Sequence, residues 1–108
     1  MALQLPTPVA AYFSAEARDD FAQLAETFAE DGRVRDEGKT YEGRSAIAAW
    51  MAEAKRKYSH KTKPLSATER DGAFVVRTRL SGPFPGSPIE VEHNFRLVGD
   101  AIESLEIG

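Results

Sequence analysis

The sequence predicts an α+β fold in which helices pack on one face of a curved antiparallel sheet. Apolar residues recur at helical spacing in the first half of the chain, and from His60 onward they alternate with polar residues as in half-buried strands. Helices therefore come first and strands follow. This order is typical of an α+β layer rather than of alternating βαβ units.

Length and composition fit one domain over residues 1–108, with 42% hydrophobic and 29% charged residues. The net charge of −3 gives no broad positive field, so we expect no nucleic-acid partner. No stretch has the length of a membrane span, and the chain contains no cysteine for disulfides or thiolate chemistry. We expect no membrane association and a cytoplasmic location.

The first helix is expected over residues 8–18. Thr7 supplies an N-cap oxygen, and Pro8 has the fixed φ that suits the first helical position. The apolar stripe of this helix should consist of Val9, Tyr12, Phe13 and Ala17.

A second, short helix should begin at Asp20, which is spaced from Gln23 as in a capping box. Its apolar face comprises Phe21, Leu24, Ala25 and Phe28. Asp31-Gly32 should interrupt this pattern. The alternation over residues 33–37 then predicts a short strand with Val34 and Asp36 on the same side.

After a loop over residues 38–43, the third helix is predicted over residues 44–58. The residues that match its period are Ile47, Trp50, Met51, Ala54 and Tyr58. Near the expected end of this helix lies a basic cluster of Lys55, Arg56, Lys57, Lys61 and Lys63. Cations there complement the helix dipole, and phosphate binding is the less favoured alternative.

The second half of the chain predicts a meander of antiparallel strands. The residues expected on the inner face are Phe74, Val76, Thr78, Leu80, Val91, His93, Phe95 and Leu97. Asp71-Gly72 and Gly99-Asp100 predict tight turns, and residues 101–107 a closing strand. The Gly- and Pro-rich segment from Ser81 to Pro88 should form a stiff loop, placed to rim a pocket.

Several kinds of chemistry lack their motifs. The two histidines, His60 and His93, have no ligand-spaced partner for a metal, and the chain contains no phosphate loop, Gly-x-Ser-x-Gly elbow or dinucleotide fingerprint. We therefore expect neither a metal nor a cofactor.

Three polar residues lie on otherwise apolar faces: Tyr12, Asp36 and His93. Such groups either pair structurally or act on a ligand. The structural alternatives are a core tyrosine with its hydroxyl at the edge, an Asp36 that caps or pairs with Arg35 or Arg44, and a hydrogen-bonded core histidine.

The order of these elements, with Phe-Ala-Glu-Asp-Gly-Arg-Val-Arg-Asp at 28–36 and Tyr-Glu-Gly-Arg-Ser-Ala-Ile at 41–47, resembles the nuclear transport factor 2-like superfamily. The branch it resembles is the SnoaL-like and ketosteroid isomerase-like one, and the resemblance covers nearly the whole chain. It implies one cone-shaped SnoaL-like domain. The superfamily includes isomerases, cyclases, epoxide hydrolases, dehydratases and noncatalytic binders, so the fold alone does not select a function.

The resemblance to ketosteroid isomerases extends to single residues. Tyr12 falls at their oxyanion tyrosine and Asp36 at their proton-shuttling aspartate, and the interval of 24 residues (36 − 12) agrees. His93 departs from the pattern, because those enzymes carry a protonated aspartic acid there as second oxyanion donor. A histidine can also donate a hydrogen bond, but its charge should change near neutral pH.

Two functions follow as alternatives. The first is isomerase- or cyclase-type proton transfer on a small hydrophobic carbonyl compound, with Asp36 as base and with Tyr12 and His93 holding the oxygen. The second is a noncatalytic module for hydrophobic-ligand binding or dimerisation. In both, the cavity would be shaped by Phe13, Val34, Trp50, Phe74, Val76, Phe95 and Leu97.

A homodimer is also expected, because opposite charges on the outer sheet face can pair across strands or across a two-fold axis. The residues of that face are Arg77, Arg79, Glu90, Glu92, Asn94 and Arg96.

Overall fold

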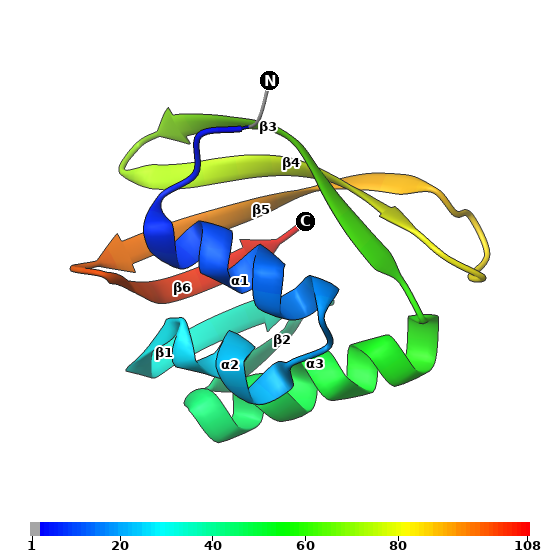
Figure 1. Cartoon of the computed structure of the whole chain (residues 1–108), viewed down its shortest axis with the longest axis horizontal. Helices are drawn as coiled ribbons and strands as arrows, with labels where there is room; N and C mark the ends of the chain where they lie inside the picture. The colour runs from blue at the N-terminus through cyan, green and yellow to red at the C-terminus, as the bar shows by residue number, and fades with distance from the viewer. Residues whose placement is uncertain (1–2) are drawn as a thin grey trace.

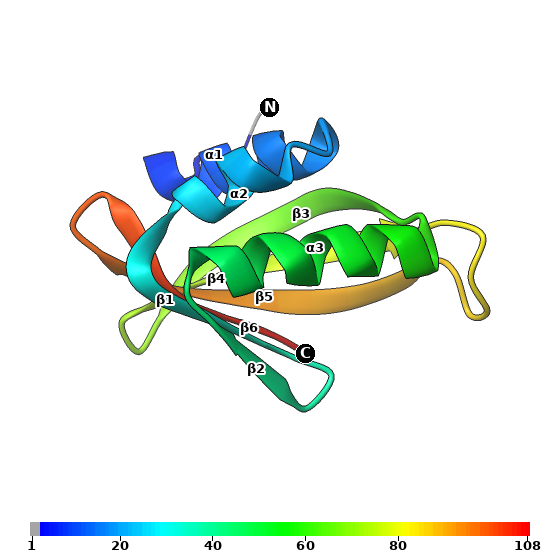
Figure 2. The same ribbon diagram turned by 90° about the horizontal axis from the view of Figure 1, so that it is seen from below.

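Three helices lie on one side of a curved, unclosed six-stranded sheet in the computed structural model, which describes residues 3–108 (Figures 1 and 2). The elements are α1 (Thr7–Ala17), α2 (Phe21–Glu26), β1 (Phe28–Asp36), β2 (Lys39–Glu42), α3 (Arg44–Tyr58), β3 (Lys61–Arg70), β4 (Ala73–Ser81), β5 (Ile89–Val98) and β6 (Ala101–Ile107). The α+β class is confirmed.

The strand order is β2-β1-β6-β5-β4-β3. All neighbouring strands are antiparallel except β1 and β6, which run parallel. The sheet is therefore mixed, whereas the sequence predicted a wholly antiparallel one. The parallel pair is possible because the chain between β1 and β6 contains a hairpin, a helix and the meander, which is more than the dozen residues that a crossover needs.

The helices begin and end close to their predicted limits. In α1, Pro6 is the N-cap and Thr7 the first helical residue, so the predicted Thr7 cap is wrong by one position. In α2, the Asp20 carboxylate accepts a hydrogen bond from the Gln23 backbone N–H at 3.1 Å, which confirms the predicted cap. The bounds of α3 are those predicted, and Ser59 ends it in the left-handed conformation with φ of 49°.

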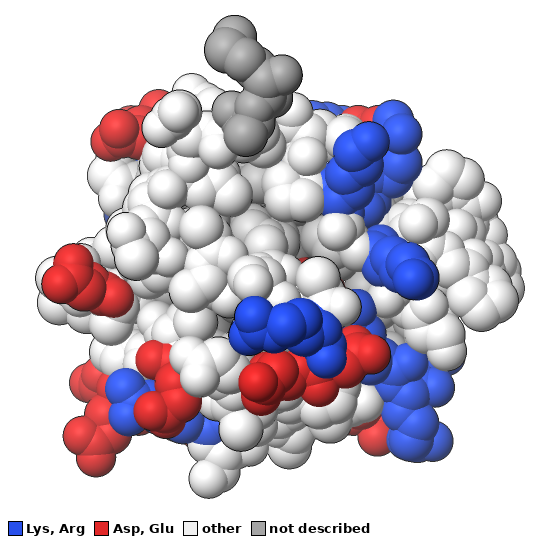
Figure 3. Space-filling view, viewed as in Figure 1, with Lys and Arg blue, Asp and Glu red and all other residues white. Residues whose placement is uncertain are grey.

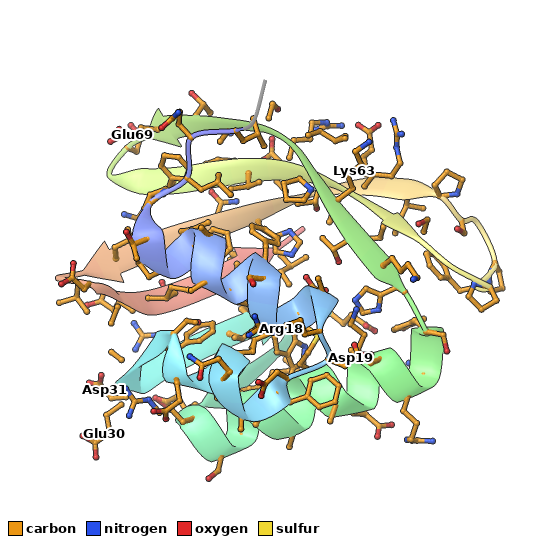
Figure 4. All side chains as sticks on the ribbon, viewed as in Figure 1. Arg18, Asp19, Glu30, Asp31, Lys63 and Glu69 are labelled. Carbon is orange, nitrogen blue, oxygen red and sulfur yellow. The ribbon has the colours of Figure 1, made fainter. Side chains whose placement is uncertain are left out.

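Strand β1 starts five residues earlier than predicted, at Phe28 instead of Arg33. Asp31-Gly32 does not end the pattern but lies in an irregular stretch of the strand, where the register with β6 shifts. Asp31 projects outward there, at the end of the molecule away from the β4–β5 loop (Figure 4). Such a bulge lets the strand bend without leaving the sheet.

The predicted loop over residues 38–43 contains strand β2. Glu37 and Gly38 both have positive φ, of 53° and 76°, as a two-residue hairpin turn requires. This turn pairs Asp36 with Lys39 and so fixes the end of β1.

In the meander, both predicted turns are present, and Asp71 and Gly72 have positive φ. The inward residues of β4 and β5 are buried or half-buried with one exception, because Leu97 is 37% exposed. A register shift between Arg96 and Leu97 carries Leu97 out of the alternation. Its predicted inner position is therefore wrong.

The hydrophobic core lies between the helices and the sheet, and all three helices together with β1, β4, β5 and β6 contribute to it. It includes Phe13, Val34, Val76 and Phe95, and the partly buried Phe74 packs against it. These residues fill the space under α1 and leave the other end of the helical layer free.

On the outer face, charged side chains pair within the sheet. Arg77 contacts Glu90 at 2.9 Å, and Arg70 contacts Glu92 at 3.6 Å. The predicted pairing across strands is thus confirmed within one chain. No helix within residues 3–108 has both the length and the apolar character to cross a membrane.

Candidate functional site

A cavity of about 470 Å³ lies between α1, α3 and the sheet, on the side of the β4–β5 loop. Its lining residues are Tyr12, Glu16, Asp36, Glu37, Trp50, Met51, Ala54, Tyr58, His60, Thr62, Leu80, Phe84, Pro85, Ile89, Val91, His93, Ile107 and Gly108. Its volume falls in the range of small-molecule sites.

The structure brings Tyr12, Asp36 and His93 to this one cavity, from α1, the end of β1 and the middle of β5. Of the predicted apolar lining, only Trp50 contributes. Phe74 packs against the core and Leu97 is exposed. The other four predicted lining residues are buried in the core: Phe13, Val34, Val76 and Phe95. In the paired strands β4 and β5, Phe74 and Phe95 lie at the core end, whereas Leu80 and Ile89 lie at the loop end and line the cavity.

Tyr12 is fully buried, and its hydroxyl has no hydrogen-bond partner among residues 3–108. Its ring is held edge-on by Phe13, Phe28 and Phe95 at centroid distances of 5.1, 6.1 and 5.4 Å. Burial, followed by the charges of Glu16 and Asp36, raises the pKa of Tyr12 well above its usual value. The phenol therefore keeps its proton, and its hydroxyl is available as a hydrogen-bond donor.

Asp36 is half-buried, and its Oδ2 accepts a hydrogen bond from Trp50 Nε1 at 3.1 Å. Desolvation raises its pKa, and the Trp50 hydrogen bond opposes this in part. Neither arginine considered from the sequence pairs with Asp36, because Arg35 donates to Thr40 and Arg44 donates to the Phe28 carbonyl.

His93 is 3% exposed and stacks on Phe95 at 6.1 Å. Burial lowers its pKa to about 4, so the ring is neutral near neutral pH. The predicted change of charge near neutral pH is therefore wrong, because desolvation outweighs the neighbouring carboxylate charge.

The neutral His93 ring has two possible roles, set by Thr78. The Thr78 hydroxyl lies 3.1 Å from His93 Nδ1 and 3.2 Å from the Val91 carbonyl oxygen, and it has only one proton. If that proton goes to Nδ1, Nε2 carries a hydrogen and is a donor. If it goes to Val91, Nδ1 carries the hydrogen and Nε2 is an acceptor.

Sequence reasoning missed a further polar group on the cavity, Glu16. Glu16 is only 2% exposed, and its Oε2 accepts from the Thr62 hydroxyl at 2.7 Å and lies 3.3 Å from His60 Nε2 and 3.7 Å from Lys55 Nζ. Desolvation opposes its ionisation, but hydrogen bonds from His60 and Thr62 and the charge of Lys55 outweigh it and lower the Glu16 pKa. Glu16 is thus an ionised carboxylate inside the protein.

The signal for Glu16 is present in the sequence. The buried stripe of α1 continues from Val9, Tyr12 and Phe13 to Glu16, not to Ala17, which is exposed. Residues 12 and 16 are four apart and therefore share one helix face. A carboxylate at that position of an apolar stripe indicates a buried partner.

The mouth of the cavity is apolar. Phe84 of the β4–β5 loop contacts Tyr58 edge-on at 5.9 Å, and the segment from Leu80 to Ile89 carries no charge. In Figure 3 this loop forms the white lobe at the right of the view. Gly82 fixes its base, because a Cβ there would lie 3.1 Å from the Ser59 carbonyl oxygen. The loop rims the cavity, as predicted.

Among the residues that the structure describes, the lining combines three carboxylates, Glu16, Asp36 and Glu37, with no lysine or arginine. Among residues 3–108, no group of three or more metal-ligating side chains comes together. The arrangement suits a ligand that offers an oxygen to the Tyr12 hydroxyl and carries no negative charge of its own.

Comparison with known families and structures places this architecture. A family model described as SnoaL-like domain matches residues 9–101. A candidate polyketide cyclase from Sinorhizobium meliloti is similar with a TM-score of 0.91 and 39% identity, covering 96% of this chain and 95% of that one. A search of curated proteins finds no significant match.

Two further solved structures share the fold at lower identity. A protein with ketosteroid isomerase-like fold from Catenulispora acidiphila, in complex with trimethylamine, has a TM-score of 0.82 and 23% identity, covering 97% of this chain and 86% of that one. An NTF2-like protein from Cytophaga hutchinsonii has a TM-score of 0.76 and 17% identity, covering 100% and 93%.

Proposed function

The chain belongs to the SnoaL-like domain family, and from this premise and the lining of the cavity we propose that it catalyses proton transfer on a small hydrophobic carbonyl compound. The reaction is of the isomerase or cyclase type. The structural relative from Sinorhizobium meliloti, a candidate polyketide cyclase, supports the same class of chemistry.

One observation carries the proposal. The Tyr12 hydroxyl is fully buried without a partner among residues 3–108, on a cavity that also presents the Asp36 carboxylate. A buried hydroxyl without a hydrogen bond costs stability. A ligand oxygen that accepts from it removes that cost, and the removal is greatest when the oxygen becomes negative in the transition state.

In this mechanism Asp36 takes the proton from the carbon beside the carbonyl group, and the electron pair of the C–H bond moves to form an enolate. The Tyr12 hydroxyl donates to the enolate oxygen. His93 donates a second hydrogen bond to this oxygen from Nε2 when the Thr78 hydroxyl donates its own hydrogen bond to His93 Nδ1. Partial desolvation raises the Asp36 pKa, which makes this carboxylate a stronger base than one in water.

The charges of the lining select the ligand. Within residues 3–108, three carboxylates face the cavity and no lysine or arginine does, so a carboxylate or phosphate on the ligand would be repelled. The apolar mouth at Tyr58, Phe84 and Ile89 suits a hydrocarbon portion. We therefore propose a neutral ketone or enone as the substrate class.

The test uses a panel of β,γ-unsaturated cyclic ketones of increasing size, with formation of the conjugated enone followed by ultraviolet absorbance. Wild type should convert at least one, and Asp36→Asn should lose about 10²-fold or more in rate. Asp31→Asn is the matched control, since Asp31 is an exposed carboxylate on the same strand, away from the loop (Figure 4). Absence of any turnover, or full activity in Asp36→Asn, would overturn the proposal.

A second candidate is binding without catalysis, favoured by the acidic and aromatic lining. The structure with trimethylamine from Catenulispora acidiphila belongs to a protein of the same fold. A small alkylammonium ion would find Asp36 and Glu37 beside the rings of Trp50 and Tyr58 here, a combination that attracts cations. Calorimetric titration with trimethylamine and with a neutral ketone decides between the two, because only a receptor would prefer the amine and show no turnover.

The homodimer and the cytoplasmic location stay predictions. Analytical ultracentrifugation measures the first, and cell fractionation measures the second. Since the charges of the outer face already pair within the chain, a dimer through that face should depend little on salt concentration.

A further inference from the structure

We propose that Glu16 and His60 form a second proton-transfer pair on the cavity, in which His60 exchanges a proton with the ligand and Glu16 is its positioning residue. This inference rests on the proposed function and adds a second group to it. Asp36 would remove a proton at one end of the ligand, and His60 would deliver one at the other.

The first support is the geometry around one oxygen atom. His60 Nε2 lies 3.3 Å from Glu16 Oε2, and the same oxygen accepts from the Thr62 hydroxyl at 2.7 Å. A carboxylate beside one ring nitrogen fixes the hydrogen on that nitrogen. Nδ1 of His60 then remains as the atom that takes up or releases a proton.

The second support is that the position of His60 is tightly constrained. Lys55 Nζ donates to the His60 backbone carbonyl at 2.8 Å, and the ring packs edge-on against Tyr58 at 6.4 Å. Gly82 approaches the other side, since a Cβ there would lie 3.2 Å from His60 Cα. A proton-transfer group needs such fixed placement, and a surface histidine has none of these constraints.

The third support is access to solvent. Glu16, His60 and Thr62 line the cavity and also a neighbouring cleft of about 430 Å³, whose other residues include Asp19 and Lys61. Glu16 and His60 therefore lie between the cavity and the neighbouring cleft. Figure 4 places Asp19 where α1 ends, and Asp19 contacts Lys55 at 3.9 Å. A proton lost from His60 into the cavity can be replaced from the outer cleft.

The pair is also close to the proposed oxyanion donor. Glu16 follows Tyr12 by one helical turn, so their side chains lie on the same face of α1. The buried charge of Glu16 is, after burial itself, the next cause that keeps Tyr12 protonated. One carboxylate thus contacts the His60 ring and also helps to keep Tyr12 a hydrogen-bond donor.

The complete step balances as follows. Asp36 takes the proton from the carbon between the carbonyl group and the double bond. The electron pair of the broken C–H bond moves toward the carbonyl group and forms a dienolate, whose oxygen accepts a hydrogen bond from Tyr12. The doubly protonated His60 transfers its Nδ1 proton to the far carbon, the double bond shifts, and the carbonyl group re-forms. Asp36 then releases its proton to water, and His60 takes one from the outer cleft.

The test measures the isotope at the far carbon of the product, because a pair with a merely structural role would not affect which hydrogen is incorporated there. In deuterium oxide, an unlabelled β,γ-unsaturated cyclohexenone that wild type converts should give product with solvent deuterium at the far carbon. In His60→Gln and Glu16→Gln, the rate should fall about 10²-fold, and the remaining product should retain the substrate's own hydrogen, returned by Asp36. Lys63→Gln, an exposed residue of β3, is the control and should match wild type.

The outcomes separate the two proposals. Turnover with deuterium incorporation that is equal in wild type and His60→Gln would overturn the His60 role and leave the Asp36 mechanism intact, whereas absence of turnover would overturn both. A second measurement covers a His60→Gln variant that fails to fold. Nitrogen NMR of the free wild-type protein should show hydrogen on His60 Nε2, and Glu16→Gln should lose this preference. A wild-type ring protonated only on Nδ1 would overturn the pairing.

Discussion

Tyr12→Phe should make the protein more stable and less active at the same time. The substitution removes one oxygen atom and leaves the ring among Phe13, Phe28 and Phe95. A buried hydroxyl without a partner costs about 1–3 kcal/mol. Because the Tyr12 hydroxyl has no partner among residues 3–108, its removal should recover about 1–2 kcal/mol of unfolding free energy.

For a domain of this size, about 1 kcal/mol raises Tm by roughly 4–8 °C. The same variant should lose about 10²–10³ in kcat on the ketone substrate, the usual effect of removing one oxyanion donor. A gain in stability together with a loss of kcat is informative. If Tyr12 were a core tyrosine with a structural hydrogen bond, its replacement by Phe would lower the stability of the protein and have no direct effect on kcat.

Urea denaturation gives the stability, and the enone assay gives kcat. Tyr41→Phe is the matched control, since Tyr41 is a half-buried tyrosine that packs on Trp50 at 6.2 Å and does not line the cavity. It should change stability by less than about 0.5 kcal/mol and leave kcat unchanged. A Tyr12→Phe variant that is destabilised would refute the reasoning, because it would show that the hydroxyl is hydrogen-bonded in the free protein.

Three further predictions concern other parts of the cavity. Burial lowers the pKa of His93 from 6.5 to about 4, so on acidification the histidine is protonated in the unfolded chain before it is protonated in the folded protein. The free energy of unfolding should therefore fall by up to roughly 3 kcal/mol between pH 6.5 and pH 4, with the full contribution present above pH 6.5. In urea titrations, His93→Gln should abolish this pH dependence. Because desolvation raises the pKa of Asp36, kcat/KM should fall on acidification at a higher pH than for an ordinary aspartate, and a profile centred on the ordinary value would contradict this. Phe84→Ala removes the contact with Tyr58 at 5.9 Å and should raise KM about 2–10-fold with kcat unchanged; an effect confined to kcat would show that Phe84 acts on the chemistry instead.

Periodicity predicted most of the fold because each helix has to bury one stripe and each strand one face. It predicted the bounds of α3 and both turns of the meander, where local chemistry decides the outcome. It could not predict the parallel pairing of β1 with β6, which depends on contacts between residues far apart in the chain. The position of Leu97 was wrong for a related reason, since a bulge is set by the paired strand.

For the site, a polar residue on an apolar face was a sound indicator, and it placed Tyr12, Asp36 and His93 on one cavity. The apolar lining was mostly wrong, because alternation tells which face a residue occupies but not at which end of the sheet it lies. Phe95 and Val91 share a face of β5, yet Phe95 is buried in the core and Val91 lines the cavity. His60 was missed because it precedes β3, outside any periodic segment.

The polar groups also explain why this end of the helical layer has not been filled by side chains. Covering Asp36 and Glu37 with apolar atoms would remove water from two carboxylates, one half-buried and one exposed, at a cost of several kcal/mol. Filling the cavity with one large apolar side chain would gain only about 1.5–3 kcal/mol. An open cavity is therefore the lower-energy arrangement as long as these groups are present. It follows that replacing them with apolar residues would favour closure, so the Asp36 carboxylate that is proposed as the base also helps to keep space for a ligand.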